Sequence, residues 1–80
     1  MEQLLTILEE LKPGVDFEGN KRLIDDGILE SLEIITLASE LNDEFDIEIT
    51  VADVLPENFN SAEAIWSMIE RLQDEGWQER

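Results

Sequence analysis

Apolar residues recur at helical spacing in three separate segments, and this pattern restricts the fold more than any other feature of the chain. The segments are residues 4–11, 31–45 and 61–75. In each, the apolar residues fall three and four positions apart, which places them on one face of a helix. The pattern therefore predicts an all-α fold with three main helices.

Start and stop signals bound these segments. Lys12-Pro13-Gly14 ends the first, because the residue before a proline is biased away from helical backbone angles and glycine enters turns freely. Asn60 is predicted to cap the last helix, with Glu63 three residues on completing a capping box, and Gly76 is predicted to end it. Trp66 is expected at the edge of the core and Trp77 at a frayed terminus.

The connections are of unequal length. Residues 14–30 lack sustained periodicity but contain apolar residues, which predicts a long loop pinned onto the core. After the second helix, Thr50 is predicted to cap a brief helical turn over Val51–Leu55, which Pro56 limits. We therefore expect one domain over residues 1–80, a small four-helix bundle with three main helices, one short helix and a long loop between helices 1 and 2.

The composition excludes several classes of function. The chain has no cysteine and no histidine, which removes the thiol nucleophile and the commonest general base and metal ligand, so we expect no catalytic activity of its own. Its formal net charge of −16 repels nucleic acid and favours enzymes with basic docking patches. The acids at positions 43–48 lack the spacing of a calcium-binding loop, so no specific metal site is expected.

The N-terminal residues give the remaining expectations about location. They have no basic region followed by an apolar run, and no stretch of the chain is long and apolar enough to span a membrane. A cytoplasmic protein is therefore the expectation. The chain is also expected to be a monomer.

Ser31 lies where the second helix is predicted to begin, and two interpretations stay open. Serine at a helix start is most often an N-cap that accepts a backbone hydrogen bond. A capping box is not expected, because the residue three positions later is Ile34. The other interpretation is an exposed hydroxyl that another protein modifies, since no histidine or lysine near it in sequence would activate it as a nucleophile.

The segment DDGILESLEI (Asp25–Ile34) favours the second interpretation. Together with LNDEFDIEI (Leu41–Ile49) and NFNSAEAI (Asn58–Ile65), it resembles the acyl carrier and peptidyl carrier protein family over essentially the whole chain. The resemblance implies that Ser31 carries covalent 4′-phosphopantetheine, attached from coenzyme A by a phosphopantetheinyl transferase. The thiol of this arm would hold an acyl or aminoacyl group as a thioester for partner synthases.

The resemblance also implies a docking surface for these enzymes. Glu30, where the family usually has aspartate, is predicted to form it with Glu33 and Asp43, and Leu32 is expected to be exposed among them. The strong acidity favours an acyl cargo for fatty acid or polyketide synthesis, and a D-alanyl or peptidyl carrier is the alternative. An acidic decoy protein without a cofactor is the alternative from another class.

Overall fold

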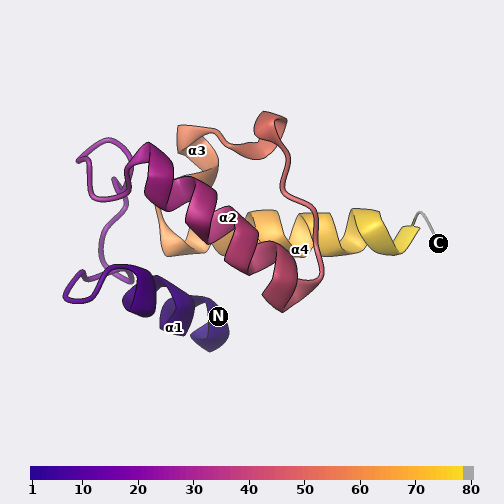
Figure 1. Cartoon of the computed structure of the whole chain (residues 1–80), viewed down its shortest axis with the longest axis horizontal. Coiled ribbons are helices and arrows are strands. Elements are labelled where there is room, and N and C mark those ends of the chain that lie inside the picture. Colours follow the sequence, from indigo (N-terminus) through magenta and orange to yellow (C-terminus); the bar gives the residue numbers. More distant parts are fainter. Residues whose placement is uncertain (79–80) are drawn as a thin grey trace.

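In the described part of the chain, three long helices pack around one core, and two short elements lie between the second and the third of them (Figure 1). The computed structural model describes residues 1–78, with side chains described for residues 1–74. The long helices are α1 (Glu2–Leu11), α2 (Ser31–Phe45) and α4 (Ala62–Gln78), and each of them contacts the other two. Within the described residues there is no strand, which confirms the predicted all-α fold.

The core is built from the predicted apolar stripes. Leu37 and Leu41 of α2 are fully buried, as are Ile65 and Ile69 of α4. The complete set of buried apolar residues is Leu4, Ile7, Leu8, Phe17, Leu23, Leu29, Leu37, Leu41, Phe59, Ala62, Ile65, Met68 and Ile69. At the core edge, the ring of Trp66 meets that of Phe45 edge-on, with centroids 5.8 Å apart. The predicted position of Trp66 is thereby confirmed, whereas the side chain of Trp77 lies outside the described residues.

The long loop between α1 and α2 is pinned onto the core, as predicted. Phe17, Leu23 and Leu29 are buried at three points along it, so the loop contributes directly to the hydrophobic core. The backbone turns at Gly14 and Gly27, whose φ angles of 87° and 75° are ones that glycine adopts without strain. Because both ends and the middle of the loop are anchored, its course toward α2 is defined.

The predictions for the short elements need correction at Pro56. A 3₁₀ turn, η1 (Val51–Asp53), follows the Thr50 cap, but Pro56 begins the short helix α3 (Pro56–Phe59) instead of limiting an earlier one. Proline suits the first position of a helix, because its missing N–H would have no partner there and its φ is already helical. The short fourth helix of the bundle therefore lies after the proline.

Both predicted ends of the last helix also differ from the structure. The hydroxyl of Ser61, not the side chain of Asn60, accepts the hydrogen bond from the Ala64 N–H at 3.0 Å, so Ser61 caps α4. The side chain of Asn60 instead accepts hydrogen bonds from the loop between α1 and α2. At the other end the helix continues through Gly76 to Gln78. A glycine inside a helix costs only about 1 kcal/mol relative to alanine, and the helix tolerates it here.

Candidate functional site

Ser31 is the first residue of α2, and its side chain is exposed. The N-cap is the preceding residue, Glu30, whose backbone is extended with φ −98° and ψ 170°. Among the described residues, the Ser31 hydroxyl has no hydrogen-bond partner. The interpretation of Ser31 as the helix cap is therefore wrong, and its hydroxyl is left open to solvent.

A capping box that the sequence did not predict starts the helix. Glu30 is the N-cap and Glu33 the third helical residue, and the carboxylate of Glu33 accepts the Glu30 N–H at 2.9 Å. The prediction counted from Ser31 and so found Ile34, whereas counting from Glu30 finds an acid at the required position. Glutamate is an uncommon N-cap, which is why the sequence pattern favoured the serine.

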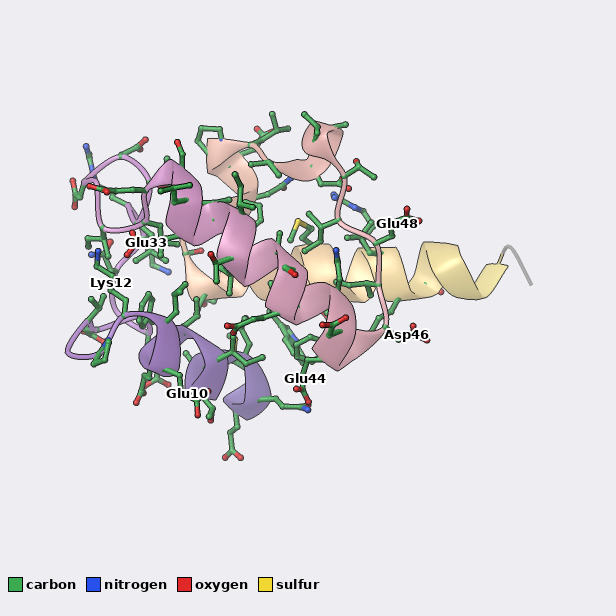
Figure 2. All side chains as sticks on the ribbon, viewed as in Figure 1. Glu10, Lys12, Glu33, Glu44, Asp46 and Glu48 are labelled. Carbon is green, nitrogen blue, oxygen red and sulfur yellow. The ribbon has the colours of Figure 1, made fainter. Side chains whose placement is uncertain are left out.

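Lys12 holds the same carboxylate from the other side. Its Nζ lies 2.8 Å from Oε2 of Glu33, and both side chains are about one-third exposed or less (35% and 25%). Figure 2 shows the two side chains together between the end of α1 and the start of α2. The hydrogen bond from Lys12, and then that from the Glu30 N–H, lower the pKa of Glu33. Glu33 is therefore ionised at neutral pH and paired within the fold.

The residues before Ser31 are held by a compact turn. The carbonyl of Leu23 accepts hydrogen bonds from the N–H groups of Ile28 and Leu29, at 3.0 and 2.9 Å. Leu23 and Leu29 are themselves buried, so the turn is fixed both by hydrogen bonds and by the core. Glu30 and Ser31 follow immediately, and the loop therefore delivers the serine to the surface from an anchored position.

This geometry fits a phosphodiester on the Ser31 oxygen. The hydroxyl is exposed, and the N–H groups of the first helical turn together with the helix dipole favour negative charge at that end. Glu30 is exposed beside it and opposes the added charge, whereas the charge of Glu33 is offset by Lys12. The residues present can therefore hold such a group without rearrangement of the core.

The predicted docking residues fall into two groups. Glu30, Leu32 and Asp43 are exposed, and the exposed fraction of Leu32 is 79%. Glu33 is instead half-buried and paired with Lys12, so its carboxylate faces the α1 side of the site. The predictions missed Ile35, which is 64% exposed one helical turn after Leu32. Its spacing from Leu32, and its separation from the stripe of Leu37 and Leu41, were the signals available in the sequence.

The acids at the end of α2 are arranged separately from one another. Figure 2 shows Glu44, Asp46 and Glu48 spread along the end of the helix and the segment after it. Glu44 accepts a hydrogen bond from the Gln3 side chain at 2.8 Å. Across the part of the chain that the structure describes, no three acidic side chains converge to hold a metal ion. None of the helices in that part is long and apolar enough to cross a membrane.

Comparison with known proteins shows the family to which the chain belongs. Residues 2–74 match the family described as "Phosphopantetheine attachment site", and the chain belongs to this family of carrier proteins. The group that the family attaches covalently is 4′-phosphopantetheine. Such carriers interact with synthetase and transferase enzymes.

Similar curated proteins are named more specifically. The D-alanyl carrier protein of Lactococcus lactis subsp. lactis (strain IL1403) is 30% identical over 76 residues, which cover 92% of this chain and 96% of the relative. The D-alanyl carrier proteins of two strains of Lactobacillus delbrueckii subsp. bulgaricus are each 29% identical over 75 residues, covering 91% of this chain and 92% of the relative. The predicted carrier role is thereby confirmed, and fatty acid biosynthesis in particular gains no support.

Proposed function

We propose that Ser31 is the residue that receives 4′-phosphopantetheine and that the chain, as a single carrier domain over residues 1–80, presents a thioester-bound cargo to partner enzymes. The observation that supports this most directly is the exposed Ser31 hydroxyl at the first position of α2, without a capping role. When bound, the arm supplies the thiol that a chain without cysteine lacks.

The protein's own residues present the hydroxyl and do not activate it. The chain contains no histidine, and the Lys12 ammonium is occupied by Glu33. We assign the base that accepts the Ser31 proton to the transferase, as Ser31 Oγ forms its bond to phosphorus and the nucleotide part of coenzyme A leaves. The chain itself performs no catalysis. Because coenzyme A is an intracellular metabolite, a cytoplasmic location accompanies this proposal.

We propose D-alanine as the cargo to test first. The support is that relatives covering nine-tenths of the chain are named D-alanyl carrier proteins. This reverses the preference for an acyl cargo that acidity suggested. The acidity of the chain reports on the charge of its partners and not on what the thiol carries. It therefore does not discriminate between an acyl and a D-alanyl cargo.

The cargo is tested with the phosphopantetheinylated protein, an adenylate-forming D-alanine ligase, ATP and radiolabelled D-alanine. The expected result is protein-bound label that hydroxylamine releases, as a thioester requires. L-Alanine and the Ser31→Ala variant are the matched controls and should remain unlabelled. Loading by a fatty acyl ligase, with none by the D-alanine ligase, would contradict the D-alanyl proposal and favour the acyl alternative.

We propose that the partner enzymes bind this acidic chain through basic surfaces. The chain carries 21 acidic and 5 basic residues, and Glu30 and Asp43 are exposed on α2. Complementary charge speeds encounter and sets orientation more than it raises affinity. The same field disfavours nucleic acid as a ligand. Membership of the carrier family leaves the acidic decoy alternative without support.

A further inference from the structure

Asn60 joins the α3–α4 junction to the loop that leads to Ser31. Its backbone carbonyl accepts the Leu23 N–H at 2.9 Å. Its side-chain oxygen accepts the N–H groups of Ile24 and Asp25, at 2.9 and 3.2 Å, and its side-chain nitrogen lies 3.4 Å from a carboxylate oxygen of Asp25. One residue therefore satisfies the backbone N–H groups of three consecutive residues that lie 35 to 37 positions earlier in the sequence.

The hydrogen bonds continue from this segment toward the serine. Leu23, which Asn60 holds through its N–H, accepts through its carbonyl the N–H groups of Ile28 and Leu29. Glu30 and Ser31 come next in the chain. Asn60 is thus connected through Leu23 to the residue that lies two positions before Ser31.

The remaining backbone hydrogen bonds of this turn are local. The Asp26 N–H bonds to the Arg22 carbonyl at 2.8 Å, and the Gly27 N–H bonds to the Ile24 carbonyl at 3.0 Å. Local bonds fix the shape of a turn but not its place on the domain. The buried side chains of Leu23 and Leu29 and the contacts to Asn60 supply that placement.

We infer that Asn60 is a positioning residue that holds residues 23–30 in the conformation recognised by the phosphopantetheinyl transferase. The inference rests on the proposed attachment at Ser31. Without the Asn60 side chain, the N–H groups of Ile24 and Asp25 lose their partners and the segment becomes more mobile. The transferase must then order it on docking, and this entropy cost weakens binding.

The expected kinetic effect is confined to recognition. Ser31 stays in place because α2 is anchored by Leu37 and Leu41 and by the Lys12–Glu33 contact. For the Asn60→Ala protein as substrate of the transferase, the KM should rise about fivefold, while kcat stays within about twofold of the wild-type value. If Asn60→Ala acted only by destabilising the fold, any other variant with the same loss of stability should change the kinetics in the same way.

Asn58 offers a matched control two residues away. It is also half-buried, and its side chain donates a hydrogen bond to the Asp53 carbonyl at 2.8 Å, which ties α3 to η1 and not to the loop before Ser31. Apo proteins carrying Asn60→Ala or Asn58→Ala would be compared with the wild type, using coenzyme A and a broad-specificity transferase. Amide hydrogen exchange at Ile24 and Asp25 would report on the segment independently of any enzyme.

The inference is supported if Asn60→Ala alone raises KM and alone speeds exchange at Ile24 and Asp25. It is overturned if both variants change KM equally, or if KM is unchanged in Asn60→Ala. A wild-type protein that accepts no phosphopantetheine would instead overturn the proposed function, and the inference with it. If the wild type is modified and Asn60→Ala has the same kinetics as the wild type, the inference is overturned but the proposed function is not.

Discussion

The Nζ of Lys12 lies 2.8 Å from the Oε2 of Glu33, and this contact fastens the end of α1 to the first turn of α2. The same Glu33 side chain accepts the Glu30 N–H through its other oxygen. One carboxylate therefore holds both the neighbouring helix and the cap next to Ser31. The start of α2 is consequently held by contacts to α1 and to its own cap.

This contact predicts a pH-dependent contribution to stability. Because Lys12 and the Glu30 N–H lower the pKa of Glu33 from its ordinary value of 4.5, the folded state favours the ionised carboxylate. The stabilisation is fully present above the unfolded-chain pKa and is lost as the pH falls through the lower folded pKa. We expect Glu33→Gln to reduce the free energy of unfolding by about 1 kcal/mol at pH 7, with the difference shrinking below about pH 4.5.

Urea unfolding of both proteins between pH 3 and 7 measures this difference. Glu63→Gln is the matched control, because Glu63 pairs with Lys21 at 2.7 Å and its pKa is also lowered, but both side chains are more than 60% exposed. Solvent screens such a pair, so its removal should matter less. A Glu33→Gln difference that stays constant across this pH range would contradict the assignment.

Leu32 should contribute to recognition and not to folding. Its side chain is 79% exposed, whereas that of Leu37 on the same helix is fully buried. Leu32→Ala is expected to change the free energy of unfolding by less than about 0.5 kcal/mol and to slow modification by the transferase. Leu37→Ala should cost about 2–5 kcal/mol. Thermal melts and modification rates of the two variants test this, and a strongly destabilised Leu32→Ala protein would place Leu32 in the core edge instead.

Charge reversal tests the proposed docking acids. Glu30→Lys and Asp43→Lys should each slow modification at low salt, and the effect should fade as ionic strength rises, because surface charges are screened. Glu10→Lys makes the same charge change on α1, where Figure 2 shows Glu10 on the side away from α2. Equal slowing by all three variants would indicate a dependence on net charge alone and would contradict a docking surface on α2.

The net charge of −16 predicts that salt stabilises the fold. Like charges lie closer in the folded protein than in the unfolded chain, and ion pairs such as Lys12–Glu33 and Lys21–Glu63 offset only part of this repulsion. The melting temperature near pH 7 should therefore rise as sodium chloride is increased from 10 to about 300 mM, a range over which the Debye length falls several-fold. Melting curves followed by circular dichroism measure this, and a constant melting temperature would mean that repulsion is negligible.

The helices and their buried stripes could be predicted from the sequence because the spacing of the apolar residues is enough to place them on one face of a helix. Leu37, Leu41, Ile65 and Ile69 are examples, and all four are buried. The ends of the elements could not be predicted in the same way. Ser31 and Asn60 both have the local properties of a cap, yet tertiary contacts gave Asn60 another role, and the Glu30–Glu33 pair displaced Ser31. The partners of Asn60 lie 35 or more residues away in sequence, which a local pattern does not contain. The Glu30–Glu33 pair is local, and it was missed because glutamate is an uncommon N-cap.

The site was predicted in the same uneven way. The exposure of Ser31, Leu32 and Asp43 agrees with their predicted roles, which stay predictions until they are tested. The partial burial of Glu33 depended on Lys12, 21 residues earlier, and sequence spacing gave no reason to pair these two residues. The exposed Ile35 lies off the buried stripe of α2, and no role was predicted for it from the sequence.

The most direct test of the central claim is the mass of the intact protein after incubation with coenzyme A and a phosphopantetheinyl transferase. We expect the wild type to gain one phosphopantetheinyl group, which peptide mapping should locate on Ser31. The Ser31→Ala protein should gain none, although it folds normally, because the exposed hydroxyl contributes no contact to the fold. A Ser39→Ala variant, which alters another exposed serine of α2, should be modified like the wild type. Modification that persists in Ser31→Ala, or a wild type that gains nothing, would contradict the account.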